Sequence, residues 1–234
     1  MYAMSVGGKA VYWWARSVVW VLGKLLFRMH VEGASGFPRT GGVLICSNHV
    51  SHLDPPLVGT AAPRMVFHMA KRELFKVPAL TWFMRQIGTI MVHRGQGRQA
   101  IQDAIEYLRK GRPVVIFPEG TRSKTGVLMK GHTGAIVIAI SADAPLLPTV
   151  IIGSEKAMTK GSKAIKAVPV TVRFGDPYTI AYNGDRTHIP KDVLERELRV
   201  LMEKIEALLP DYMKPSAEDK AEWYSQFGVA GPVP

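Results

Sequence analysis

Short apolar segments alternate with helical patterns along most of this 234-residue chain, and this alternation restricts the fold more than any other feature. A buried strand is a short continuous apolar run, whereas a helix that covers a sheet has apolar residues every three or four positions. Strands that alternate with helices form a largely parallel sheet with helices on both faces. The expected strands are Val43 to Cys46, Met65 to Ala70, Thr89 to Val92, Val114 to Phe117, Leu147 to Ile152 and Val168 to Phe174.

The expected helices lie between and after these strands. Asp54 precedes Pro55 and Pro56, and we expect it to be the N-cap of a short helix. No repeat or change of composition marks a second domain, so residues 31–214 are expected to form a single α/β domain with a mixed, largely parallel sheet. Residues 215–234 are expected to be a C-terminal extension with a disordered end. The other expected helices are Arg72 to Gln86 with a break at Pro78, Ala100 to Lys110, Gly131 to Ala142 and Pro190 to Leu209.

Residues 1–30 differ from the rest because they combine tryptophans with cations. No apolar run in them approaches the roughly 20 residues that cross a bilayer. On a helix, the four cations fall within an arc of about 120° and leave an aromatic and aliphatic face. This pattern predicts an amphipathic helix in the membrane interface with its basic side toward the lipid headgroups. The alternative is a helix whose aromatic face packs on the domain. The cations are Lys9, Arg16, Lys24 and Arg28.

The overall charge favours an anionic partner. Thirty lysines and arginines against 19 acidic residues give a formal net charge of +11. Such a charge suits nucleic acid, an acidic membrane surface or a phosphorylated substrate. The chain has no recognition-helix, zinc-finger or ribonucleoprotein pattern, so we expect no nucleic acid partner. The single cysteine, Cys46, excludes an internal disulfide and fits a reduced cytosolic setting, and we expect no cleaved signal peptide.

His49 and Asp54 are the first candidate catalytic residues. Five residues apart, they would point about 140° apart on a straight helix, and they would lie on opposite faces of a strand. They can meet only if the chain bends, and a strand that ends near Cys46 before a Pro-Pro helix start supplies the bend. A carboxylate on one ring nitrogen would fix the tautomer and leave the other nitrogen as a general base.

Other interpretations of this stretch remain open. Asp54 could be only a helix cap, and His49 only a loop histidine. His49 and His52 could form a metal pair, although no further ligands occur at a recognisable spacing, so we expect no metal. Ser47 and Ser51 could be nucleophiles, but neither lies in a Gly-x-Ser-x-Gly turn.

A second candidate stretch follows the strand that ends at Phe117. Glu119, Gly120, Thr121 and Arg122 offer a flexible turn, exposed amides, a hydroxyl and a guanidinium, which together suit a phosphate ester. Arg94 follows another expected strand and could supply a second cation at the same edge of the sheet.

The chain resembles the glycerolipid acyltransferases of the 1-acylglycerol-3-phosphate acyltransferase type. The resemblance rests on four blocks in the order of that family, and together they span residues 47 to 150. The blocks are Asn48-His49 through Asp54, Gly88 through Arg94, Phe117 through Ser123, and Ala144 through Val150.

This resemblance implies transfer of a fatty acyl group from acyl-CoA or acyl carrier protein to 1-acylglycerol 3-phosphate (lysophosphatidic acid), giving phosphatidic acid. It implies His49 and Asp54 as the catalytic pair and no cofactor. The acceptor phosphate would be held by the second and third blocks, and by Lys71 and Lys130 unless these only face solvent. Enzyme and product would meet at the cytoplasmic face of a membrane with anionic lipids, where the protein would be monotopic or peripheral. Glycerol 3-phosphate or another lysophospholipid is the alternative acceptor, and a basic nucleic-acid-binding protein or non-catalytic membrane adaptor is the remote alternative.

Overall fold

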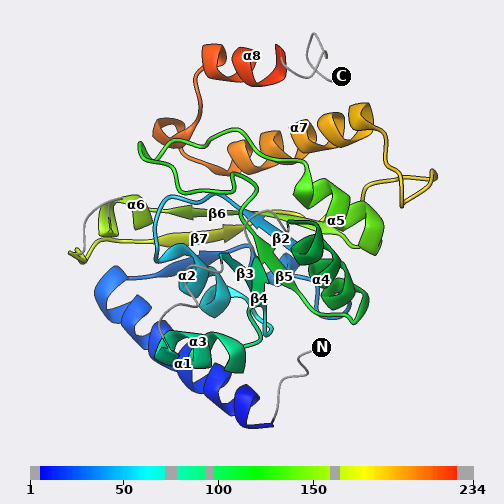
Figure 1. The fold of residues 1–234 in the computed structure, drawn as a ribbon. Helices are drawn as coiled ribbons and strands as arrows, with labels where there is room; N and C mark the ends of the chain where they lie inside the picture. The colour runs from blue at the N-terminus through cyan, green and yellow to red at the C-terminus, as the bar shows by residue number, and fades with distance from the viewer. Residues whose placement is uncertain (1–5, 72–77, 93–96, 159–163, 226–234) are drawn as a thin grey trace.

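In the computed structural model, seven strands form one sheet in the order β1-β7-β6-β2-β5-β3-β4 (Figure 1). The structure describes residues 6–71, 78–92, 97–158 and 164–225. The strands are β1 (His30–Glu32), β2 (Leu44–Ser47), β3 (Phe67–Lys71), β4 (Ile90–Val92), β5 (Val114–Ile116), β6 (Leu146–Ile152) and β7 (Thr171–Phe174).

Most neighbouring strands of the sheet are parallel. Strand β2 pairs in parallel with both β5 and β6, and β3 pairs in parallel with both β5 and β4. The exception is the antiparallel pair of β6 and β7, which also reverses β1 because β1 is parallel to β7. The predicted mixed, largely parallel sheet is therefore confirmed.

Helices cover both faces of the sheet, as predicted. On one face, Leu44 and Cys46 of β2 share a buried cluster with residues of α4, α5 and α7. On the other face, Val43 and Ile45 share a cluster with Leu57 and other residues of α2. Alternate residues of β2 thus point to opposite faces, and both are apolar because both are covered. The helices are α2 (Asp54–Ala61), α3 (Pro78–Gln86), α4 (Gly97–Arg109), α5 (Gly134–Ala142), α6 (Ser154–Ala157), α7 (Lys191–Leu208) and α8 (Ala217–Ser225).

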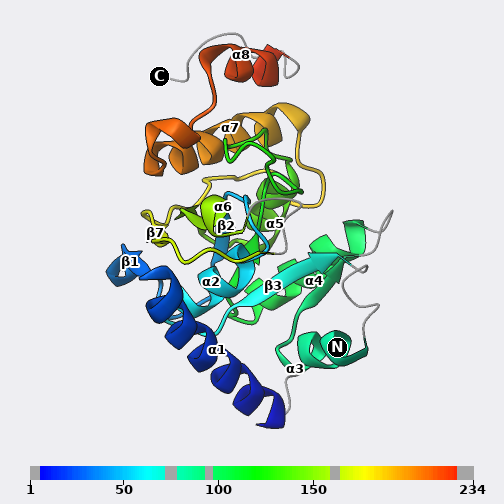
Figure 2. The ribbon, with the colours of Figure 1, turned by 90° about the vertical axis from the view of Figure 1, so that its left-hand side faces the viewer.

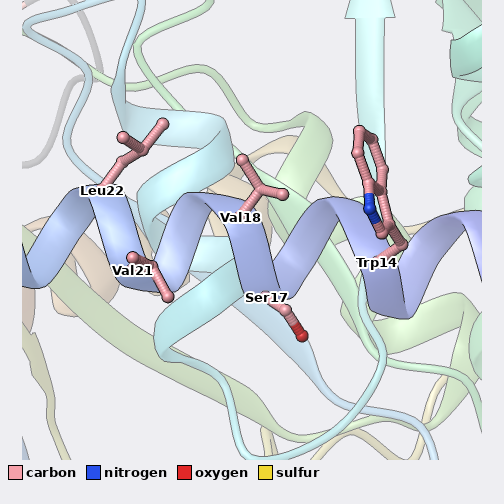
Figure 3. Close-up of a pocket in the computed structure, with 5 residues that line it drawn as sticks. All are labelled: Trp14, Ser17, Val18, Val21 and Leu22. Carbon is pink, nitrogen blue, oxygen red and sulfur yellow. The ribbon is translucent and has the colours of Figure 1, made fainter.

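The N-terminal segment forms the long helix α1 (Val6–Phe27), which lies along the outside of the domain near α2 and α3 (Figure 2). Its inner side buries Tyr12 and Phe27, and the Tyr12 hydroxyl accepts a hydrogen bond from the Val66 amide at 3.1 Å. Its outer side carries Trp14, which is 68% exposed, and Leu25, which is 74% exposed. A shallow apolar hollow on this outer side is shown in Figure 3; it is lined by Trp14, Ser17, Val18, Val21 and Leu22.

The exposure of Trp13, Trp14 and Trp20 goes against the alternative prediction, in which the aromatic face of α1 packs on the domain. Contact of its basic side with lipid headgroups stays a prediction. Arg16 donates to the carbonyl oxygen of Ala62 at 2.9 Å, and Lys24 donates to that of Met29 at 2.7 Å. Ala62 is the C-cap of α2, where carbonyl groups lack partners within the helix and a cation is favoured. Arg16 and Lys24 therefore bind main-chain oxygens, while Lys9, Lys24 and Arg28 remain exposed beside the apolar side chains of the outer side.

Several other predictions need correction. The predicted N-cap Asp54 is the first residue of α2, and Leu53 occupies the N-cap position. The short elements β1 and α6 and the helix α8 were not predicted from the sequence. Residues 72–77, the first part of the predicted helix before Pro78, lie outside the described residues, as do residues 229–234. None of the helices in the described ranges is long and apolar enough to cross a membrane.

Candidate active site

The loops that carry the candidate residues leave the sheet at one edge. Strands β2, β5 and β6 are adjacent and parallel, so their carboxyl ends lie side by side. His49 follows β2, Glu119 follows β5, and Ser154 follows β6. Open α/β sheets bind their ligands outside the carboxyl ends of the strands.

His49 and Asp54 are in direct contact at this edge. Nδ1 of His49 lies 2.8 Å from Oδ2 of Asp54. An ionised carboxylate only accepts hydrogen bonds, so Nδ1 carries the proton and Nε2 is the nitrogen that can accept one. The bend predicted between a strand and a Pro-Pro helix start is present, because β2 ends at Ser47 and α2 starts at Asp54.

The Asp54 carboxylate is fully buried and bonded at both oxygens. Besides His49, Oδ2 accepts hydrogen bonds from the amides of Val50 and Ser51, each at 2.7 Å. Oδ1 accepts a hydrogen bond from the Ser154 hydroxyl at 2.6 Å. A buried charge is stable only when it is paired and hydrogen-bonded in this way. Asp54 thus orients both the histidine ring and the loop that carries it.

The second candidate stretch holds His49 from the other side. Oε1 of Glu119 accepts a hydrogen bond from the His49 amide at 2.6 Å, and the Ser123 amide donates to the His49 carbonyl oxygen at 2.8 Å. The ring of Phe117 stacks on the His49 ring, with 4.1 Å between ring centroids and 23° between the planes. The two stretches singled out in the sequence are therefore joined at His49.

Glu119 is itself buried and bridges two segments of main chain. Its Oε2 accepts a hydrogen bond from the Met129 amide at 3.0 Å. Burial raises the pKa of Glu119 to about 8, while the His49 and Met129 amides pull it back down. Both Glu119 oxygens bind main-chain amides, so this side chain braces the site.

The turn after Glu119 is open to solvent. Gly120 and Thr121 are exposed and Arg122 is half-buried. Gly120 has a φ of +65°, a conformation that side-chain-bearing residues rarely adopt. Desolvation, the nearby Arg122 and His49 lower the pKa of His52, while Asp54 raises it. His52 is therefore within electrostatic range of Arg122, His49 and Asp54.

Of the three remaining predicted residues, only Lys130 has a side chain within the described part of the structure. Lys71 ends β3 at the same edge of the sheet, but its side chain lies outside the described part of the structure. Arg94 also lies outside the described residues; β4, which precedes it, ends at Val92 at this edge. Lys130 is half-buried and is followed by Gly131, where a side chain would collide with Met202 and Leu198 of α7.

The alternative chemistries receive no support from the described residues. Within them, no group of three or more His, Cys, Asp or Glu side chains is placed to bind a metal ion. Ser47 and Ser51 are fully buried, and their hydroxyls donate to the main-chain oxygens of Asn48 and Met158. Neither hydroxyl is presented as a nucleophile.

Sequence reasoning missed two residues that support the pair. The Asn48 side chain donates to the Ile151 carbonyl oxygen at 3.1 Å and accepts from the Ile151 amide at 2.8 Å. Ser154, which bonds Asp54, lies directly after β6 and Gly153. The position of Ser154 just past a buried strand was the available signal, because the other candidate stretches follow strands in the same way.

Comparisons with known proteins show the family of this chain. The family model described as Acyltransferase matches residues 28–152. A 1-acyl-sn-glycerol-3-phosphate acyltransferase of Cocos nucifera is 30% identical over 205 residues, which are 86% of this chain and 62% of that protein. A lyso-ornithine lipid O-acyltransferase of Pseudomonas aeruginosa is 32% identical over 141 residues, 59% of this chain and 52% of that protein.

A solved structure shares the fold. The 1-acyl-sn-glycerophosphate acyltransferase of Thermotoga maritima superposes with a TM-score of 0.69 at 24% identity, covering 90% of this chain and 86% of that one. The chain spans less than two thirds of the length of the Cocos nucifera relative. The family match nevertheless covers more than half of this chain and includes the paired His49 and Asp54, so the chain belongs to the acyltransferase family.

Proposed function

We propose that this protein transfers a fatty acyl group from an acyl-CoA or acyl carrier protein thioester to the free hydroxyl of 1-acylglycerol 3-phosphate, producing phosphatidic acid. The observation that carries the proposal is the contact between His49 Nδ1 and Asp54 Oδ2 at the carboxyl edge of the sheet. It is supported by membership of the acyltransferase family and by a 1-acyl-sn-glycerol-3-phosphate acyltransferase among the relatives.

The chemistry follows from the state of the histidine. With Nδ1–H bonded to Asp54, Nε2 of His49 accepts the proton of the acceptor hydroxyl as its oxygen attacks the thioester carbonyl carbon. The resulting imidazolium is stabilised by the Asp54 carboxylate. Collapse of the tetrahedral intermediate breaks the carbon–sulfur bond, and the imidazolium returns its proton to the departing thiolate. The ester forms without a covalent acyl-enzyme.

The phosphate of the acceptor would lie near the turn after Glu119. The Arg122 guanidinium and the exposed amides of Gly120 and Thr121 suit phosphate oxygens. Arg94, Lys71 and Lys130 would add positive charge around the same edge. Glu119 takes part indirectly, because it holds the His49 main chain.

The site would work at a membrane surface on the cytoplasmic side. The exposed aromatic and aliphatic side of α1 suits the apolar part of the interface, and Trp82 of α3 is also 58% exposed. Anionic lipids would attract the excess of lysine and arginine. The cations Arg16 and Lys24 lie along the flank of the helix, where they contact the Trp13 and Trp20 rings.

The test is a purified-protein assay that crosses acyl donors with acceptors. The donors are acyl-CoA and acyl carrier protein thioesters. The acceptors are 1-acylglycerol 3-phosphate, glycerol 3-phosphate and lyso-ornithine lipid, which is included because one relative bears the name of a transferase for it. We expect transfer to be fastest with 1-acylglycerol 3-phosphate. Equal rates with the phosphate-free lipid would remove the role of Arg122, and no transfer with any pair would overturn the proposal.

The matched variant for this assay is His49→Ala. It removes the base while Asp54 keeps its bonds to Val50, Ser51 and Ser154. We expect a loss of about 100- to 10,000-fold in kcat, the usual contribution of a positioned base. A folded His49→Ala protein with undiminished transfer would show that the base has been assigned wrongly.

A further inference from the structure

The hydroxyl of Ser154 supports the pair of His49 and Asp54 through a bond to the Asp54 carboxylate. It donates to Oδ1 of Asp54 at 2.6 Å, and both residues are fully buried. The other Asp54 oxygen accepts three N–H groups, including Nδ1 of His49. Among the described residues, the Ser154 side chain is the one that donates to Oδ1. This bond therefore fixes the rotation of the carboxylate about the Cβ–Cγ bond of Asp54.

The turn that carries Ser154 is built rigidly. Gly153 has a φ of +93°, and a Cβ there would lie 2.2 Å from the Pro169 carbonyl oxygen. A side chain at this position is therefore excluded on two grounds. Oε2 of Glu155 accepts a hydrogen bond from the Gly153 amide at 2.8 Å. This turn connects β6 to α6 and sets the position of the Ser154 hydroxyl.

The same turn is bound to the His49 loop at two further points. The side-chain amide of Asn48 donates to the Ile151 carbonyl oxygen and accepts a hydrogen bond from the Ile151 amide. The Ser51 hydroxyl donates to the Met158 carbonyl oxygen at 3.1 Å. Residues before, at and after Ser154 thus hold the segment that runs from Asn48 to Asp54.

We propose that Ser154 is a positioning residue that keeps Oδ2 of Asp54 directed at His49, an inference that rests on the proposed function of the pair. Without its hydroxyl, one oxygen of a buried carboxylate loses its donor. The carboxylate then rotates or admits water, and its charge moves toward the imidazole. The histidine ring loses its fixed orientation, although no group that contacts substrate has been changed.

The central experiment compares Ser154→Ala with wild-type protein in the acyl transfer assay. We expect kcat to fall about 10- to 100-fold with KM little changed, the effect of losing one hydrogen bond to a charged group. We also expect the acidic limb of the pH profile of kcat/KM to move to higher pH, because unshared carboxylate charge stabilises the imidazolium. The other ionisable groups near the pair, Glu119, His52 and Arg122, are unchanged in this variant.

Thr60→Val is the matched control. Thr60 is also buried, but its hydroxyl donates to the Arg16 carbonyl oxygen at 2.9 Å, far along α2 from Asp54. This variant should lose stability without a change in the pH profile. Ser154→Thr keeps a hydroxyl at this position and should therefore have a kcat close to that of wild-type protein. If the added methyl group prevents folding, Ser154→Cys supplies a weaker donor and should give an intermediate kcat.

A second readout does not depend on catalysis. The proton NMR resonance of the His49 Nδ1–H, assigned by its loss in His49→Gln, should move in Ser154→Ala and stay in place in Thr60→Val. An unmoved resonance together with a kcat equal to that of Thr60→Val overturns the positioning role. If wild-type protein transfers no acyl group, the proposed function fails, and the NMR comparison alone decides whether Ser154 positions the pair. If Ser154→Ala does not fold, both measurements on Ser154→Cys decide the question.

Discussion

The Glu119 carboxylate accepts a hydrogen bond from the main-chain amide of His49, with 2.6 Å between Oε1 and the amide nitrogen and 70 positions between the two residues. The other oxygen of the same carboxylate holds the Met129 amide. One buried side chain thus joins the loop after β2 to the segment after β5. The ring of His49 depends on this link for its position, since its main chain is fixed on one side by Glu119 and its side chain on the other by Asp54.

Replacing Glu119 by alanine should destabilise the fold by about 3 kcal/mol, because two partly buried amides lose their acceptor. Urea denaturation measures this difference, and acyl transfer should fall in the protein that remains folded. Glu218→Ala is the control, since Glu218 is exposed on α8. An equal midpoint for the two variants would contradict the bracing role.

The raised pKa of Glu119 also predicts how stability depends on pH. Burial raises the pKa to about 8 in the folded protein, above its ordinary value of 4.5, so the folded state holds this proton more tightly than the unfolded chain. The stabilisation is complete below about pH 4.5 and is lost as pH rises through 8, by roughly 5 kcal/mol.

Urea denaturation of wild-type protein and Glu119→Gln at several pH values tests this dependence. The glutamine variant cannot titrate, so its stability should fall less between pH 5 and 8 than that of wild-type protein. Parallel curves would assign the pH dependence to other groups.

The Asp54→Asn variant should separate the effect of the Asp54 charge on catalysis from the effect of its hydrogen bonds on the fold. The asparagine oxygen can accept the bonds now made to Oδ2, and its amide nitrogen can donate to the Ser154 hydroxyl. The fold should therefore survive, while loss of the negative charge should lower kcat by about 100- to 10,000-fold. Steady-state kinetics with a thermal melt checks both halves. A variant that keeps full kcat would show that the carboxylate charge is dispensable.

The sequence predicted the elements whose signals are local. β2, β5 and β6 appear as apolar runs because both of their faces are covered, and the turn between Ser47 and Asp54 followed from the Pro-Pro pair. Strand β1 has three residues and exists through pairing with β7, some 140 positions away, so no local pattern marks it.

Tertiary contacts decided the features that the sequence could not give. The four residues of α6 are too few to show a period. The side of α1 that faces the domain depended on where the Ala62 carbonyl lies, which only the folded chain defines. Ser154 contacts Asp54 for the same reason: their separation of 100 positions is closed by the parallel pairing of β2 with β6.

The outer side of α1 should control binding to lipid vesicles. Replacing Trp14 and Leu25 together by serine removes two largely exposed apolar groups, and we expect partition into anionic vesicles to fall about 10- to 100-fold. Co-sedimentation measures the bound fraction. Tyr212→Ser is the control, because Tyr212 is 54% exposed outside α1. Unchanged sedimentation of the double variant would show that another surface binds the lipid.

Helix α2 connects the His49–Asp54 pair to helix α1. Its first residue is Asp54, and near its other end Thr60 donates to Arg16 of α1 while Arg16 donates to Ala62. Eight helical residues measure about 12 Å. Helix α2 therefore sets the distance between the exposed side of α1 and the His49–Asp54 pair. If α1 meets a lipid surface as proposed, the length of α2 sets the height of the pair above that surface.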